Sequence, residues 1–85
     1  MWVLTSDNLE RGKNVGTRSQ DYDEHCSDKL CHRFRLLDAD DKVYYEGLSN
    51  DCDSGKAFDP LDDFGRGYAG CVSIEFLKNG TWQPL

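Results

Sequence analysis

The segment best suited to metal chemistry is His25-Cys26-Ser27-Asp28-Lys29-Leu30-Cys31-His32. Thiolates and imidazoles are the ligands that zinc prefers, and the spacing of Cys26 and Cys31 lies at the wide limit of known ligand pairs. Each histidine, however, adjoins a cysteine, and adjacent residues rarely reach one tetrahedral ion together. A second ligand pair is missing, because Cys52 and Cys71 lie far apart. A polar loop that leads into a strand is therefore favoured. The alternative that we keep is a zinc-binding domain that uses His25, Cys26, Cys31 and His32.

The acidic segment from Asp51 to Asp62 has aspartates at a spacing similar to that of a calcium-binding loop. The match fails at the positions that matter, because Lys56 stands where the invariant glycine belongs and no glutamate closes the loop. Pro60 also interrupts the segment. We expect a solvated acidic loop here and no calcium site.

No group of residues has the pattern of an active site. A cysteine and a histidine could form a nucleophile and a base, but no nucleophile elbow surrounds any cysteine. Asp62 and Asp63 are consecutive, and the glycine-rich segment 65–68 lacks the lysine of a phosphate-binding loop. We therefore expect a protein that is not an enzyme, with no catalytic residue, no cofactor and no metal. A small enzyme of unknown reaction is the remaining alternative.

The segment Phe64-Gly65-Arg66-Gly67-Tyr68 places one arginine between two aromatic residues. Arginine and tyrosine are frequent anchors of protein interfaces. In the alternative interpretation the two aromatic rings only fix the segment to the sheet, while Arg66 pairs with a nearby aspartate. The residues that we predict to contact a partner are Asp62, Asp63, Phe64, Arg66 and Tyr68.

Two hairpins are predicted to position these segments. The first joins strands 32–37 and 42–47 through a turn at 38–41, in a register that sets Leu37 opposite Lys42 and Phe34 opposite Tyr45. The second follows strand 72–76 and turns at Asn79-Gly80, the strongest short signal for a type I′ turn. Its returning strand contains Pro84, which is typical of a sheet edge.

Successive side chains of a strand point to opposite faces of the sheet, and this alternation, here called strand parity, assigns the large side chains to two faces. The inner face is predicted to hold Phe34, Leu36, Val43, Tyr45, Val72, Ile74 and Phe76. The second face holds Leu37, Tyr44, Leu77 and Trp82. The second face is too apolar to be left bare, so we expect it to be covered or to be a contact surface. The residues expected to cover it are Trp2, Phe58, Leu61 and Phe64.

The rest of the chain is predicted to be mostly irregular. Residues 2–4 form a short strand, and residues 6–30 form a polar loop, with a short strand near 15–18 as an option. At most one short helical turn is expected near 59–64, ended by Gly65. The fold is therefore a mostly β, five-stranded, twisted antiparallel sheet or a half-open barrel, for which an SH3-like closure is one option. Residues 1–85 make a single domain.

The net charge of the chain is −6, and the acidity lies in its middle. Residues 21–63 contain 13 acidic and 5 basic residues, a net charge of −8. Such a chain repels phosphate backbones, so we expect no direct contact with nucleic acid and favour a basic protein partner. The first residues turn polar too soon for a signal peptide, and no apolar run could span a membrane. These features favour the cytoplasm, where the cysteines would be reduced.

Two stretches are similar to a group of small bacterial and phage-type proteins of unknown function. They are Arg33–Gly47 (RFRLLDADDKVYYEG) and 58–76 (FDPLDDFGRGYAGCVSIEF). The resemblance contains no catalytic or ligand motif and implies a short bacterial protein. The function that we expect is therefore that of a non-enzymatic, small acidic interaction protein, an accessory or inhibitor protein of a bacterium or mobile element.

Overall fold

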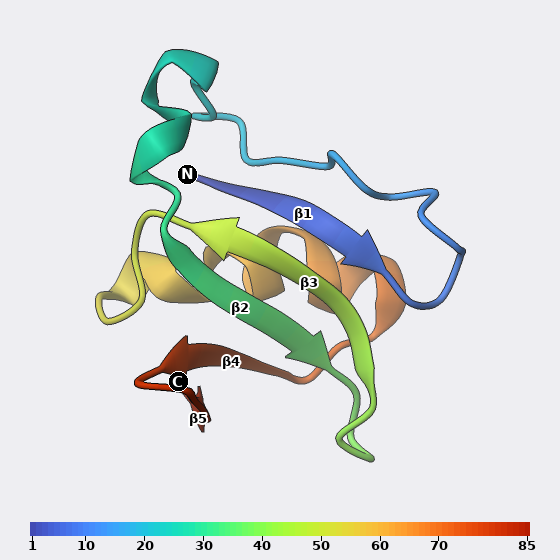
Figure 1. Cartoon of the computed structure of the whole chain (residues 1–85). Helices are drawn as coiled ribbons and strands as arrows, with labels where there is room; N and C mark the ends of the chain where they lie inside the picture. The colour runs from blue at the N-terminus through green and yellow to red at the C-terminus, as the bar shows by residue number, and fades with distance from the viewer.

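The computed structural model describes residues 1–85, and its five strands form one open, antiparallel sheet. The strands are β1 (Trp2–Asp7), β2 (His32–Leu37), β3 (Val43–Ser49), β4 (Ser73–Lys78) and β5 (Thr81–Pro84). Their order across the sheet is β1-β3-β2-β4-β5 (Figure 1). The predicted mostly β class is confirmed. Of the two expected forms, the open sheet is the one that the chain adopts.

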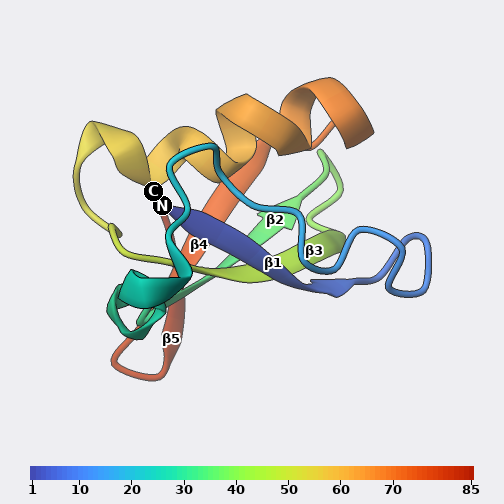
Figure 2. The same cartoon turned by 90° about the horizontal axis from the view of Figure 1, so that it is seen from above.

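Three short helical segments accompany the sheet: η1 (Glu24–Lys29), η2 (Gly55–Phe58) and η3 (Leu61–Ala69). Figure 2 shows the 55–69 region as a layer over one face of the sheet. The helical region is longer than the single turn expected, because Gly65 does not end it. Gly65 is buried inside η3, where a Cβ atom would lie 3.0 Å from Cδ1 of Leu36. The missing side chain lets the helix approach the sheet, and η3 ends instead at Gly70, with a φ of 72°.

The first hairpin forms as predicted, but its register is different. Leu36 lies opposite Tyr45, and Phe34 lies opposite Gly47. The reason is a wider connection, in which the Asp38 carboxylate accepts hydrogen bonds from the N–H groups of Asp40 and Lys42 at 2.8 and 2.9 Å. The register also shifts between Leu36 and Leu37. Over most of the hairpin the displacement is two residues, so the side chains keep their predicted faces.

The second hairpin agrees with its prediction. Asn79 and Gly80 have positive φ angles of 53° and 77°, as a type I′ turn requires. Leu77 lies opposite Trp82, and the N–H of Leu85 donates to the carbonyl of Ile74 at 3.2 Å. β5, which contains Pro84, is the edge strand.

The core lies between the sheet and the helical layer. Its buried members are Trp2, Leu4, Phe34, Leu36, Tyr45, Ala57, Leu61, Cys71, Ile74 and Phe76. The rings of Phe34 and Phe76 are 6.0 Å apart, and those of Tyr45 and Phe64 are 5.2 Å apart. Val72 was predicted to join this layer but is half exposed, because it precedes β4. Val43 is only partly buried, since it pairs with Leu37 where the register shifts.

The second face of the sheet is not covered by the predicted residues. Trp2, Leu61 and Phe64 pack in or against the core on the helical side, and Phe58 is exposed. Trp82 is instead partly covered by the guanidinium groups of Arg33 and Arg35, which lie 5.7 and 4.4 Å from its ring centre. Parity also fails for Leu37, which is buried. On this face, Trp82 is therefore covered by long basic side chains rather than by the helix.

The loop after β1 is organised by one buried carboxylate. Both oxygens of Asp7 accept hydrogen bonds, from the N–H groups of Leu9, Glu10 and Asn14 and from the Asn14 amide, all at 2.9–3.0 Å. The chain then returns along the free side of β1. The N–H of Leu4 donates to Thr17 at 2.8 Å, and the N–H of Ser19 donates to Trp2 at 3.0 Å. The optional strand near 15–18 is thus reduced to a single bridge, between Val3 and Arg18.

Tyr45 carries a buried hydroxyl that has no hydrogen-bond partner. Burial, followed by the charge of Asp7, raises the pKa of Tyr45 to about 12. We expect Tyr45→Phe to raise the free energy of unfolding by about 1 kcal/mol, because an unsatisfied buried polar group opposes folding. Urea denaturation followed by tryptophan fluorescence measures the change. Tyr44→Phe is the matched control and should not raise the free energy of unfolding, since Tyr44 is only partly buried and its hydroxyl is not a buried group without a partner. A Tyr45→Phe variant that unfolds at lower urea than the wild type would contradict this expectation.

Candidate functional site

The five residues predicted to contact a partner all lie on η3, but they do not form one surface with one role. Asp62 and Arg66 form an exposed ion pair across one helical turn, with Arg66 Nε 3.1 Å from Asp62 Oδ1. Such a surface pair adds little to stability. It does occupy Arg66, as the alternative interpretation of this segment proposed.

The two aromatic residues of η3 are stacked on each other. The ring centres of Phe64 and Tyr68 are 4.9 Å apart, with the planes inclined by 19°. Phe64 is partly buried and also contacts the ring of Trp2 at 6.3 Å. Tyr68 is 52% exposed, so it continues the aromatic column from the core to the surface. Phe64 thus fixes the helix, and Tyr68 remains free to contact another molecule.

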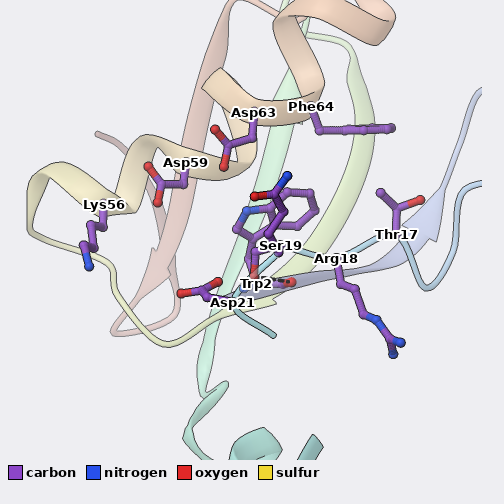
Figure 3. Close-up of a pocket in the computed structure, with 10 residues that line it drawn as sticks. Trp2, Thr17, Arg18, Ser19, Asp21, Lys56, Asp59, Asp63 and Phe64 are labelled. Carbon is purple, nitrogen blue, oxygen red and sulfur yellow. Dashed lines mark hydrogen bonds between the residues drawn. The ribbon is translucent and has the colours of Figure 1, made fainter. Parts of the chain in front are cut away.

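A groove of about 490 Å³ lies beside this column, between the helical layer and the 17–21 segment (Figure 3). Three carboxylates line it: Asp59 and Asp63 from the helical layer and Asp21 from the loop. Phe64 and Trp2 supply its aromatic surface. Arg18 and Lys56 are also among its lining residues. The groove therefore combines carboxylates, two basic side chains at its margins and aromatic rings.

The carboxylates of the groove differ in their pairing. Asp21 lies 3.4 Å from the terminal ammonium group of Met1, and hydrogen bonding to Ser19 and this charge lower the pKa of Asp21. Asp59 and Asp63 take part in none of the five ion pairs of the protein. Burial and the neighbouring Asp63 raise the pKa of Asp59 above its usual value. The terminal ammonium group and Lys56 act in the opposite direction on the pKa of Asp59, but their effect is smaller. The helical wall of the groove thus holds two like charges, neither of which forms an ion pair.

The indole of Trp2 provides the one buried donor in the groove that has no acceptor. Trp2 is only 3% exposed, and its Nε1–H makes no hydrogen bond. Figure 3 shows the nitrogen-bearing edge of the indole facing the side of the groove where Asp59 and Asp63 lie. Buried tryptophan N–H groups usually have a partner. An acceptor supplied from outside the chain would complete this site.

Sequence reasoning found only part of the groove, namely Asp63 and Phe64. It missed Asp59, although Asp59 and Asp63 have the four-residue spacing that places two side chains on one helical face. It also missed Trp2 and Asp21, which reach the groove through the path of the 8–22 loop. No residue pattern in that loop predicts this path.

The structure does not bring the cysteines and histidines together at one place. The structure contains no group of three or more His, Cys, Asp or Glu side chains placed to hold an ion. Cys26 lies within η1, and its Sγ is 3.9 Å from Asp23. Cys71 is buried in the core, and burial raises its pKa to about 11. In the acidic loop, Asp51 accepts hydrogen bonds from Asp53 and Ser54, so it shapes the turn.

Comparison of the chain with family models, with curated proteins and with solved structures finds no match. None of its helices has the length and the apolar character that crossing a bilayer requires.

Proposed function

We propose that this chain is a non-enzymatic interaction protein that binds a basic protein partner through η3 and the adjoining groove. The observation that supports the proposal is the pair of carboxylates, Asp59 and Asp63, that form no ion pair and share a groove with Phe64, whose ring stacks on exposed Tyr68. Interfaces are enriched in aromatic anchors surrounded by polar residues. In keeping with its resemblance to small bacterial and phage-type proteins, we propose an accessory or inhibitor role.

The charge distribution supports a partner of opposite sign. The chain has a net charge of −6, and complementary charge raises the rate of association and selects against acidic partners. Exposed charges are screened by salt, so such binding should weaken as ionic strength increases.

Fluorescence anisotropy with labelled twelve-residue peptides tests this proposal. We expect a peptide rich in lysine and arginine to bind, and its affinity to fall by about tenfold or more between about 20 mM and about 300 mM NaCl. A peptide of the same length with glutamate at the basic positions should not bind. Equal binding of both peptides, binding that salt leaves unchanged, or no binding of the basic peptide would refute the proposal.

A pair of double variants locates the surface. Asp62→Asn with Asp63→Asn removes two charges from η3, and we expect it to weaken binding of the basic peptide by about tenfold. Asp40→Asn with Asp41→Asn is the matched control, because it removes two exposed charges from the β2–β3 turn. The control should change the affinity by less than about twofold. Equal losses in the two variants would show that the net charge, rather than this surface, determines binding.

A further inference from the structure

We propose that the groove is an anchor pocket for one lysine or arginine residue of the partner. The cationic group would lie between Asp59 and Asp63, and the main-chain carbonyl of the same or the next residue would accept the hydrogen bond of Trp2 Nε1. This inference rests on the proposed function and names the chemistry of its recognition.

The position of the cation follows from the two carboxylates on the helical wall. Asp59 and Asp63 are one helical turn apart and share a face, and neither forms an ion pair in the structure. Two neighbouring like charges disfavour each other when they are partly withdrawn from water. A guanidinium or ammonium group between them would remove this repulsion and form charge-assisted hydrogen bonds.

The basic groups of the chain itself do not fill this position. The terminal ammonium group of Met1 donates to Asn50 at 3.0 Å and lies beside Asp21. The guanidinium of Arg18 lies over the ring of Tyr22, at 4.7 Å from its centre. Lys56 forms no ion pair, and Figure 3 shows its side chain directed away from Asp63. The place between the two carboxylates therefore remains open to a cation from another molecule.

The need for a carbonyl follows from Trp2. Its Nε1–H can only donate, so a cation cannot satisfy it, and neither of the two carboxylates nor Gln20 accepts its hydrogen bond. A ligand that fits both features carries a positive charge and a hydrogen-bond acceptor a short distance apart. A basic residue within a polypeptide has both groups, whereas a simple polyamine has only the charge.

The size and the surface of the groove suit such a residue. A volume of about 490 Å³ lies within the range of ligand pockets and exceeds the needs of one side chain, which leaves room for the adjoining backbone. The rings of Phe64 and Trp2 line the groove. Aromatic faces accommodate both the apolar stem and the charged head of lysine or arginine.

NMR titration of the indole N–H signals tests the pocket directly. The probe is acetyl-Gly-Gly-Arg-Gly-Gly-amide, and Trp82→Phe assigns the Trp2 signal, because the chain has two tryptophans. We expect the Trp2 indole proton to shift downfield and to saturate, while the Trp82 signal stays in place. The peptide with citrulline in place of arginine keeps the carbonyl and loses the charge, and it should leave both signals unchanged. Spermidine should shift the backbone signals near Asp59 and Asp63 without moving the Trp2 indole proton.

Single substitutions then separate the groove from the rest of η3. We expect Asp59→Asn to weaken binding of the arginine peptide by about tenfold, because one charged hydrogen bond is lost. Asp62→Asn removes an equal charge outside the groove, and it should weaken binding by less than about twofold. Asp59→Asn should melt at a temperature no lower than the wild type, since it relieves repulsion from Asp63. The melting temperature of Asp59→Asn thus shows whether a loss of binding comes from a loss of folding.

The outcomes distinguish this inference from the function on which it rests. If the twelve-residue basic peptide binds but Asp59→Asn binds it as well as the wild type, the pocket is refuted and the proposed function stands. A Trp2 indole signal that does not respond to the arginine peptide also refutes the pocket. If no basic peptide binds, both proposals fail.

Discussion

Gly47→Ala is expected to lower the free energy of unfolding by about 3 kcal/mol or more, because the added methyl group has no space. A Cβ atom at this position would collide with the carbonyl oxygen of Val3 and would lie 2.5 Å from Cζ of the Phe34 ring. Both neighbours are fixed, since Val3 belongs to β1 and Phe34 is fully buried. Relief would require β1 and β3 to separate. Urea denaturation of the variant and the wild type measures the difference.

Gly67→Ala is the matched control for this substitution. Gly67 lies in η3, and a Cβ atom there would meet no atom within 4 Å. We expect it to raise the free energy of unfolding by about 0.5–1 kcal/mol, because alanine loses less backbone entropy in a helix. If the two substitutions had effects of similar size and the same sign, close packing of β3 against β1 and Phe34 would not be the cause.

Asp7→Asn is expected to destabilise the protein by about 2 kcal/mol near pH 7, since the carboxylate accepts four hydrogen bonds. In asparagine, an NH₂ group replaces one of the two carboxylate oxygens. This group would face N–H donors instead of accepting their hydrogen bonds. Burial by itself raises the pKa of Asp7, but the N–H groups of Glu10, Asn14 and Leu9 outweigh this effect and lower the pKa overall. The folded state therefore favours the charged form.

The lowered pKa determines how the effect of Asp7→Asn depends on pH. Stabilisation by a carboxylate whose pKa is lowered on folding is complete above the unfolded value of about 3.9 and is lost as the pH falls through the folded value. The difference between Asp7→Asn and the wild type should thus be constant above about pH 5 and should shrink below about pH 4. Urea midpoints measured across this range test it, with Asp40→Asn as an exposed control. A difference that persists unchanged in acid would show that the charge of Asp7 is not involved.

The alternation of side chains along the strands predicted which residues face the core. This prediction depends only on strand parity and not on the exact register. The first hairpin is displaced by two residues from the expected register, yet Phe34 and Tyr45 still point into the core. The displacement itself could not be read from the strands, because it arises from hydrogen bonds to the Asp38 side chain in the turn. Parity is least informative where a strand begins or shifts register, as Val72 and Leu37 show.

The helical layer and the groove were harder to predict, because they depend on contacts between parts of the chain that are distant in sequence. Gly65 has the residue type of a helix end, but its function is close packing against Leu36, which only the tertiary structure reveals. The groove joins Trp2, Asp21 and the helical wall, three parts of the chain that are distant in sequence. Local patterns therefore identified the residues of η3 but not their neighbours across the groove.

The two outer strands of the sheet limit the ways in which another chain could associate with it. The free side of β1 already bonds residues 16–19, and β5 has four residues, of which Pro84 lacks an N–H group. A partner peptide that adds itself as a further strand would find few main-chain groups to pair with. A protein partner of the kind proposed above would then have to contact side chains rather than extend the sheet.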